Sequence, residues 1–355
     1  MQPERANPYI ERIDAIAPAR LDLAHLPTPL QPLKRIGGEL GVELWVKRDD
    51  YTGAELSGNK IRKLEYVLAA ARAQGADTVL TCGGVQSNHC RATALAAARL
   101  GLSCRLLLRV PDPAAPPALE ANSLLDRLAG ADIVWVSPEQ YRRRDAVFAD
   151  QAQALAADGH RPYLIPEGAS DPVGAWGYIR AMAELAADID AIGGPDAKPT
   201  TVIHATGSGG TGAGLVLGRL LLGLNVRVIG INVCDDRKYF LKVQGDICEA
   251  AIARYSLDID FLRQRDLEII DGYVGRGYAL CRPEELGLIR YVCRREGLVL
   301  DPVYTGKAFY GMVQQLKADR RIFGQRVIFV HTGGLLGLFP EAAELAPLLS
   351  PSADP

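Results

Sequence analysis

The sequence lacks an excess of either charge, a long apolar run and any cysteine spacing typical of a metal site. Its 40 basic and 42 acidic residues give a net charge of −2, which argues against a polyanionic or acidic-membrane partner. No apolar run reaches the roughly 18 residues that span a bilayer, and residues 1–20 lack the apolar segment of a signal peptide. The seven cysteines, an odd number, fit reduced thiols. We therefore expect a cytoplasmic protein that binds no metal, nucleic acid or membrane.

The chain contains a regular alternation of short apolar runs and amphipathic helices. Its 355 residues, 48% of them hydrophobic, suffice for a large core and two lobes. The predicted strands are Leu44–Lys47, Thr78–Cys82, Arg105–Leu108, Ile133–Val136, Tyr163–Ile165, Thr201–Ala205, Val226–Asn232 and Val327–Val330. The predicted helices are Lys60–Ala73, Asn88–Leu100, Pro117–Leu128, Arg142–Ala157, Pro172–Leu185, Gly212–Leu221, Pro283–Glu296, Gly306–Ala318 and Pro340–Ala346. This order favours an α/β fold with parallel sheets between helices, as one wide sheet or two smaller ones.

Two segments stand out as connections between these elements. Residues 111–117 contain four prolines and are predicted to form a surface connection. Residues 188–199, which include Gly193-Gly194-Pro195, are predicted to be a loop or the boundary between two lobes.

A glycine-rich segment, Thr206–Gly214, follows a predicted strand and opens a predicted helix. Its glycines allow a tight turn and a close backbone approach, and the free amides at a helix N-terminus bind anions. Ser208 and Thr211 add hydroxyl donors. A strand–helix turn without a ligand is the alternative, but this density of glycines and hydroxyls exceeds what a turn needs. We therefore predict a phosphate site.

The kind of phosphate is left open by the loop itself. Gly207-x-Gly209-x-x-Gly212 fits the dinucleotide fingerprint, and Asp235 ends the next strand, so an NAD-dependent oxidoreductase is one possibility. The loop has no Gly-Lys-Ser/Thr and is therefore not a nucleotide-triphosphate loop. A single phosphate, as in pyridoxal phosphate, needs only this loop.

Lys60 follows the flexible step Ser57-Gly58-Asn59 and begins an amphipathic helix. Asn59 is a candidate helix cap. A lysine in a dry pocket, or beside another cation such as Lys63, has a lowered pKa and attacks as the neutral amine. Lys60 is therefore a candidate for a Schiff base with pyridoxal phosphate, and a solvated surface lysine is the alternative.

Three further motifs place polar side chains where a strand runs into a turn. In the first, Gln86-Ser87-Asn88-His89 opens a helix whose N-terminus suits a substrate carboxylate, although Ser87 also fits an ordinary cap and His89 a structural role. The second motif places Tyr304 before a helix, and the alternative to a role of Tyr304 in a site is packing in the core. The third motif carries Thr332 before Gly333-Gly334, and the alternative to a role in a site is a turn that serves only packing. Tyr278 lies between glycines, as a lid or rim residue would.

Together these motifs resemble the fold-type-II pyridoxal-phosphate enzymes of the 1-aminocyclopropane-1-carboxylate deaminase and D-cysteine desulfhydrase family. The resemblance runs from Leu26 to Phe339. It rests on Trp45-Val46-Lys47-Arg48-Asp49-Asp50, Ser57-Gly58-Asn59-Lys60-x-Arg62-Lys63-Leu64-Glu65, Gln86-Ser87-Asn88-His89, Asp301-Pro302-Val303-Tyr304-x-Gly306-Lys307 and His331-Thr332-Gly333-Gly334. It implies two open, twisted, mostly parallel α/β lobes with the cofactor in the cleft between them. The larger lobe would comprise residues 1–65 and 171–355 and the smaller lobe residues 66–170, and a homodimer is usual.

The resemblance also implies a role for each site residue. Lys60 is the Schiff-base lysine and, with Ser87, Tyr278 and Tyr304, forms the catalytic set. The cofactor-binding set adds Lys63 near the phosphate, Asn88 at the ring hydroxyl, Gly207, Ser208, Gly209, Gly210 and Thr211 around the phosphate, and Thr305 or Thr332 at the ring nitrogen. The substrate-binding set is Gln86, Ser87, Asn88, Tyr278 and Tyr304.

Two positions separate the branches of this family. Deaminases resemble a Tyr-Glu-Gly-Lys pattern and carry leucine at the position of Thr332, whereas this chain has Thr305 after Tyr304. Both threonines resemble the desulfhydrase branch. The implied reaction is α,β-elimination from D-cysteine to pyruvate, ammonia and hydrogen sulfide. Altered residues around Cys82, Tyr278 and Leu335 leave another β-substituted amino acid open. Cyclopropane ring opening, an NAD-dependent oxidoreductase and a cofactor-free binding protein are the competing hypotheses.

Overall fold

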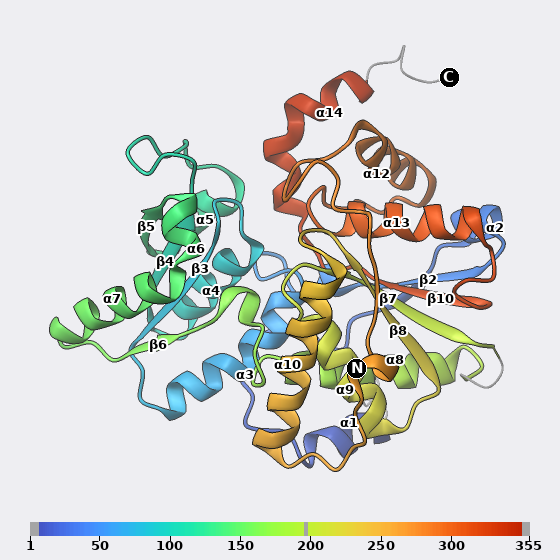
Figure 1. Cartoon of the computed structure of the whole chain (residues 1–355), viewed down its shortest axis with the longest axis horizontal. Coiled ribbons are helices and arrows are strands. Elements are labelled where there is room, and N and C mark those ends of the chain that lie inside the picture. Colours follow the sequence, from blue (N-terminus) through green and yellow to red (C-terminus); the bar gives the residue numbers. More distant parts are fainter. Residues whose placement is uncertain (1–6, 195–197, 350–355) are drawn as a thin grey trace, which may run out of the picture.

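The computed structural model describes residues 7–194 and 198–349, and its chain is organised around two sheets (Figure 1). The smaller sheet has four parallel strands in the order β5-β4-β3-β6. These strands are β3 (Thr78–Gly84), β4 (Ser103–Arg109), β5 (Asp132–Val136) and β6 (Pro162–Leu164). The sequence left one sheet or two open, and the structure has two.

The larger sheet has six strands in the order β1-β2-β10-β7-β8-β9. All its pairs are parallel except β1 with β2. Its strands are β1 (Leu30–Pro32), β2 (Glu43–Lys47), β7 (Thr200–Thr206), β8 (Val226–Asn232), β9 (Glu268–Ile270) and β10 (Arg326–Val330). The mixed α/β class with mostly parallel sheets is therefore confirmed, while the exact lobe boundaries remain a prediction.

Helices flank both sheets (Figure 1). They are α1 (Pro8–Asp14), α2 (Lys34–Leu40), α3 (Asn59–Ala73), α4 (Asn88–Arg99), α5 (Ala121–Leu128), α6 (Pro138–Arg142), α7 (Arg144–Ala157), α8 (Trp176–Ala191), α9 (Gly210–Leu222), α10 (Arg237–Tyr255), α11 (Arg263–Asp266), α12 (Pro283–Glu296), α13 (Thr305–Ala318) and α14 (Ala342–Leu349). Within the described residues, no helix has the length and apolar character needed to cross a bilayer.

Several predicted elements have different limits in the structure. Helix α5 begins four residues later than predicted because Glu120, not Pro117, supplies its N-terminal cap, through a reciprocal bond with Ser123. Residues 188–191 were predicted to be loop but complete α8, and residues 195–197 of that segment lie outside the described part of the chain. The prediction also missed the three-residue edge strands β1 and β9 and the whole of α10.

A buried ion network fixes α3 against α8 and the strand β2. The guanidinium of Arg62 donates to Glu184 at 2.8 Å and to Asp49 at 2.8 Å, and all three side chains are buried. Gly177 allows the helices to approach, since a Cβ there would lie 2.5 Å from the backbone carbonyl carbon of Arg62. The turn at the start of α3 is therefore held in one position relative to both sheets.

The carboxyl ends of β3, β7 and β10 all lead into polar turns. Strand β3 is followed by the start of α4, β7 by the glycine loop that opens α9, and β10 by Thr332-Gly333. Ligands of open parallel sheets bind beyond the carboxyl ends of the strands. The fold therefore brings together at this edge the motifs that are far apart in the sequence.

Candidate active site

Lys60 reaches the site because Gly58 turns the chain into α3. Gly58 has φ 105°, and a Cβ there would lie 2.9 Å from the carbonyl oxygen of Thr332, so only glycine fits. The backbone amide of Asn59 donates to that same carbonyl at 3.0 Å. The prediction that Asn59 caps the helix is wrong: Gly58 is the cap residue, and the Asn59 amide group donates to Thr211 at 3.1 Å. The start of α3 is thus joined to both β10 and α9.

The environment of Lys60 favours its neutral form. Burial disfavours the ammonium and lowers the pKa of Lys60 to about 8, although the carboxylates of Glu167 and Asp301 oppose the shift. Burial, and not a charge on Lys63, is therefore the main cause. An amine with this pKa is a competent nucleophile near neutral pH.

The glycine loop between β7 and α9 forms an anion cradle. Gly209, with φ 86°, precedes the first turn of α9, which carries no acidic side chain. Ser208 and Ser170 share a hydrogen bond of 2.8 Å between their hydroxyls, and the amide of Gly210 donates to Ser170 at 3.3 Å. These donors surround the helix N-terminus, where backbone amides favour a bound anion.

Lys63 lies on the same side of the cradle. Its ammonium donates to the carbonyl of Gly168 at 3.1 Å and to Ser170 at 3.3 Å. Burial and the charge on Lys60 hold the pKa of Lys63 well below its usual range, with partial compensation by Asp171. A bound phosphate would supply the negative charge that these two lysines lack, so the residues present fit a phosphorylated cofactor.

The start of α4 forms another wall of the pocket. Ser87 is buried and caps α4 by accepting a bond from the Cys90 amide at 3.2 Å, so the cap is present alongside any substrate role. Asn88 lines the pocket and accepts from Asn122 at 3.3 Å. Gln86 points toward α5, where it donates to the carbonyl of Glu120 and accepts from the Asn122 amide.

His89 also lines the pocket and is buried. The Thr81 hydroxyl donates to the carbonyl of Ile165 at 2.8 Å, so the His89 Nε2 at 2.8 Å must be the donor to Thr81. Burial and the charges of the two lysines hold the pKa of His89 well below its usual range. Its Nδ1 is therefore an acceptor, and within the described residues it has no partner.

Two phenols stand beside Lys60. The hydroxyls of Tyr278 and Tyr304 are 2.7 Å apart, and the Lys60 ammonium is 5.9 Å from the centre of the Tyr304 ring. Burial raises the pKa of Tyr278 to about 12 and that of Tyr304 well above its usual range. Both groups are protonated at neutral pH and can pass a proton along their shared hydrogen bond.

The two threonines at the predicted ring-nitrogen position have different surroundings. Thr332 lines the pocket, whereas Thr305 is buried and does not. The Thr305 hydroxyl donates to the Asp301 carboxylate at 2.6 Å and accepts from the Asp301 amide at 2.8 Å. Its contact with a cofactor ring thus remains a prediction.

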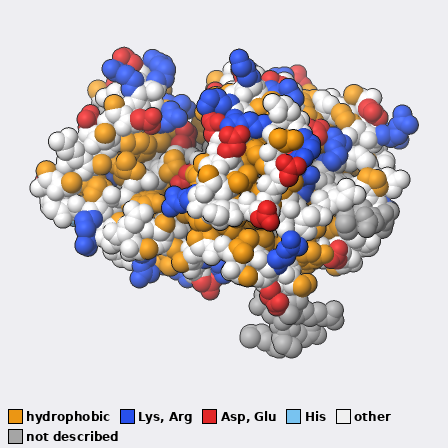
Figure 2. Space-filling view, turned by 60° about the horizontal axis from the view of Figure 1, so that its bottom comes forward, with side chains coloured by type: hydrophobic (Ala, Val, Ile, Leu, Met, Phe, Trp, Pro, Cys, Tyr) orange, Lys and Arg blue, Asp and Glu red, His pale blue; other side chains and the backbone are white. Residues whose placement is uncertain are grey.

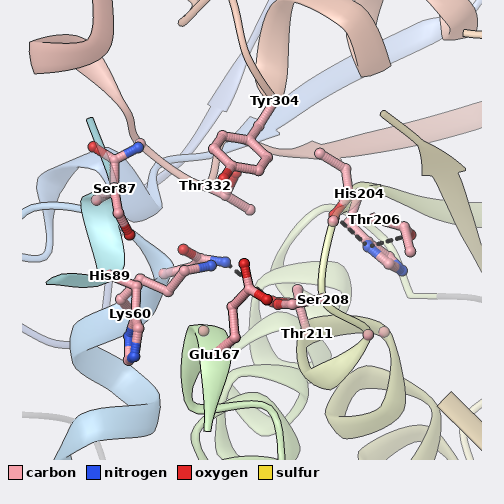
Figure 3. Close-up of a pocket in the computed structure, with 18 of the residues that line it drawn as sticks. Lys60, Ser87, His89, Glu167, His204, Thr206, Ser208, Thr211, Tyr304 and Thr332 are labelled. Carbon is pink, nitrogen blue, oxygen red and sulfur yellow. Dashed lines mark hydrogen bonds between the residues drawn. The ribbon is translucent and has the colours of Figure 1, made fainter. Parts of the chain in front are cut away.

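Figure 3 shows these groups around one pocket. Lys60, Ser87 and His89 lie on one side, His204, Thr206 and Ser208 lie opposite, and Tyr304 lies over the space between them. The cavity volume between these groups is about 50 Å³, so the pocket is narrow in this structure. Within the described residues, no group of three or more His, Cys, Asp or Glu side chains could hold a metal ion.

Sequence reasoning missed several residues of this site. His204 lies near the end of the strand that enters the glycine loop, and this position was a usable signal, whereas Thr206 belonged to the predicted glycine-rich segment but was given no role of its own. Glu167, Gly168 and Ser170 follow β6, at the carboxyl end of the smaller sheet. Their position after a strand gave a hint, but no motif marked them.

Comparisons with known proteins give a consistent result. Residues 21–333 match a family described as "Pyridoxal-phosphate dependent enzyme". A bifunctional D-cysteine desulfhydrase/1-aminocyclopropane-1-carboxylate deaminase of Arabidopsis thaliana is 42% identical over 92% of this chain and 81% of its own length. A D-cysteine desulfhydrase of Yersinia pestis is 37% identical over 90% of this chain and 95% of its own length.

The solved structures agree with these sequence relatives. The crystal structure of a 1-aminocyclopropane-1-carboxylate (ACC) deaminase homologue has a TM-score of 0.84 and 36% identity, and the match covers 97% of this chain and all of that one. A threonine deaminase of Solanum lycopersicum, at 16% identity and a TM-score of 0.63, shares the fold over 96% of this chain and 87% of its own.

Proposed function

This chain belongs to the pyridoxal-phosphate dependent enzymes, in the family of the D-cysteine desulfhydrases and ACC deaminases, and we propose that it eliminates the β-substituent of an amino acid, most favourably the sulfur of D-cysteine. The reaction consumes water and yields pyruvate, ammonia and hydrogen sulfide. The observation that carries the proposal is a lysine with a pKa of about 8 in one pocket with an anion cradle and two protonated phenols. An NAD-dependent oxidoreductase is excluded by the family assignment.

The residues of the pocket divide into holding and reacting groups. We assign the cofactor phosphate to the amides and hydroxyls of Gly207–Thr211, with Lys63 and Ser170 beside them. Lys60 would hold the cofactor at its aldehyde group. When bound, the cofactor withdraws electrons from the substrate α-carbon, which lowers the cost of removing its proton.

Proton transfer at the substrate is assigned to Lys60 and the two phenols. The free amine of Lys60 is neutral in a large share of molecules near pH 8 and would accept the α-proton. The Lys60 nitrogen lies 5.9 Å from the centre of the Tyr304 ring, and the Tyr304 and Tyr278 hydroxyls share a hydrogen bond. This pair supplies a proton to the departing thiolate. Ser87 and the N-terminus of α4 hold the substrate carboxylate.

Ring opening of ACC is the competing activity, because relatives of Thermotoga maritima and Pyrococcus abyssi carry the name "Putative 1-aminocyclopropane-1-carboxylate deaminase". The threonines at 305 and 332 favour the desulfhydrase reading. A hydroxyl at the ring nitrogen, unlike a carboxylate, does not hold that nitrogen protonated. The cofactor ring then withdraws electrons less strongly, which suffices for the loss of a good leaving group such as sulfide.

A substrate comparison tests the proposal. Purified protein with pyridoxal phosphate is incubated with D-cysteine, L-cysteine, β-chloro-D-alanine and ACC, and sulfide, pyruvate and 2-oxobutanoate are measured. We expect sulfide and pyruvate from D-cysteine, and no visible absorption band or turnover in Lys60→Ala. Formation of 2-oxobutanoate from ACC without sulfide from cysteine would replace the proposed function with the deaminase.

We also propose that the protein is a cytoplasmic homodimer. All seven cysteines are free and six of them are buried, which suits a reducing compartment. Cell fractionation and analytical ultracentrifugation of the purified protein test the two statements, and a monomer that turns over at full rate would refute the second.

A further inference from the structure

Arg109 occupies an unusual position at the end of β4. Its guanidinium lies 4.7 Å from the centre of the Tyr141 ring and 5.4 Å from the centre of the Tyr278 ring. The side chain is half-buried. Across the part of the chain that the structure describes, its guanidinium forms no hydrogen bond and no ion pair. The guanidinium therefore has two aromatic rings as neighbours and no counter-ion among the described residues.

That space is a groove that continues into the inner pocket. Arg109, Tyr141 and Phe148 line the groove, and four residues line both the groove and the pocket that contains Lys60. These shared residues are Glu167, Gly207, Ser208 and Tyr278. A substrate bonded near Lys60 with a long β-substituent would extend past Tyr278 into this groove.

Other charged groups in the groove are balanced. Arg144 faces the carboxylate of Glu167 at 4.0 Å, and Arg142, Asp145 and Asp235 are exposed to solvent. Figure 2 shows charges of both signs scattered over the face drawn, without a broad patch of one sign. The selectivity of the groove for an anion would therefore come from Arg109, whose guanidinium lies beside Tyr278. It would not come from an excess of positive charge over the surrounding surface.

We propose that Arg109 is a specificity residue that binds an anionic group carried by the β-substituent of the substrate. The proposal rests on the proposed function and narrows its substrate class to amino acids such as cysteine thioethers whose sulfur substituent carries a carboxylate. A planar guanidinium pairs with a carboxylate through two parallel hydrogen bonds. The charge of a half-buried cation without a counter-ion is poorly compensated. An anion that binds there therefore gains more binding free energy than it would at an exposed arginine.

Elimination from such a substrate needs water as its only co-reactant. The α-carbon loses its proton, the bond between the β-carbon and sulfur breaks, and the sulfur leaves with the electron pair. The departing thiolate takes a proton from the phenol pair, and hydrolysis of the remaining three-carbon unit gives pyruvate and ammonia. Arg109 acts only by holding the carboxylate at the far end of the leaving group.

A pair of substrates that differ by one charge tests the proposal. S-carboxymethylcysteine and S-carbamoylmethylcysteine have nearly the same shape, and kcat and KM for pyruvate formation are measured for both with the holoenzyme. We expect the wild type to prefer the carboxylate by at least about tenfold in kcat/KM. Arg109→Gln should lose most of this preference through KM, and Arg109→Lys should keep part of it.

The matched control is Arg105→Gln on the same strand. Arg105 pairs with Asp132 at 2.7 Å and with Gln151 at 3.1 Å and does not line the groove, so the preference should be unchanged. An equal loss of activity on both substrates in Arg109→Gln would overturn the proposal, because Arg109 would then only support Tyr278. No preference in the wild type would overturn it as well.

A binding measurement separates this proposal from the proposed function. Calorimetry with the holoenzyme gives the affinity for the two thioethers whether or not they react. If neither yields pyruvate but the wild type binds the carboxylate more tightly and Arg109→Gln does not, elimination is refuted while the anion site stands. Equal affinities in the wild type refute the anion site even where cysteine is converted to sulfide.

Discussion

The lowered pKa of Lys60 makes a prediction for the rate at which the protein captures an aldehyde. With a pKa of about 8, about a quarter of the molecules carry a neutral amine at pH 7.5. A lysine at the ordinary value of 10.5 would have only about one neutral amine in a thousand at that pH. The capture rate should therefore rise with pH up to about 8 and then level off.

Pyridoxal is the appropriate probe because it lacks the phosphate and so adds no phosphate charge beside Lys60. Protein freed of its cofactor is mixed with pyridoxal between pH 6 and pH 10, and the rate at which visible absorption appears is recorded by stopped flow. We expect a midpoint near pH 8. Lys60→Ala supplies the background from other lysines.

A second variant checks the cause of the shift. The Glu167 carboxylate raises the pKa of Lys60 against the effect of burial, so Glu167→Gln should move the midpoint to lower pH. A capture rate that rises tenfold for each pH unit up to pH 10 would mean that Lys60 has an ordinary pKa. The physical reasoning for its reactivity would then be refuted.

Three further outcomes follow from the same geometry. Arg62→Met leaves the buried carboxylates of Asp49 and Glu184 without their guanidinium and should lower the free energy of unfolding by about 3–5 kcal/mol in urea titrations. Burial raises the pKa of Glu184, but the charges of Arg62 and its neighbours outweigh this and lower it to about 2 from 4.5. The stabilisation is therefore complete above about pH 4.5 and is lost as the pH falls toward 2, so the urea midpoint should fall more steeply over this window in the wild type than in Glu184→Gln. Tyr278→Phe removes the 2.7 Å hydrogen bond to Tyr304 and should lower kcat about threefold to tenfold, with the visible absorption band retained.

The sequence predicted the parts of the fold that have a strong local signal. The eight predicted strands are apolar runs bounded by turns, and each lies within or overlaps an observed strand. The glycine loop at 206–214 and the lysine turn at 57–60 were also predictable, since glycine at Gly58 and Gly209 is required by positive φ angles of 105° and 86°.

The missed elements depend on contacts between distant segments. Helix α10 has charged residues at six of its 19 positions, and its buried side is a narrow stripe that includes Phe240, Ile247 and Ala251. The edge strands β1 and β9 have three residues each, too few for a periodic pattern. Ser170 enters the anion cradle only because β6 of one sheet ends beside α9 of the other lobe.

The structure also sharpens the distinction between the two threonines on which the choice of branch rests. The Thr305 hydroxyl already donates to Asp301 and accepts from its amide, so a bond to a ring nitrogen would require it to give up the 2.6 Å contact with the carboxylate. Thr332 lines the pocket, and its backbone carbonyl anchors the turn that carries Lys60. Because Thr332 lines the pocket and Thr305 does not, we propose that the Thr332 hydroxyl is the one that meets the ring. The residue at position 332 should therefore influence the electron demand of the cofactor directly, and the residue at 305 through the loop that Asp301 organises.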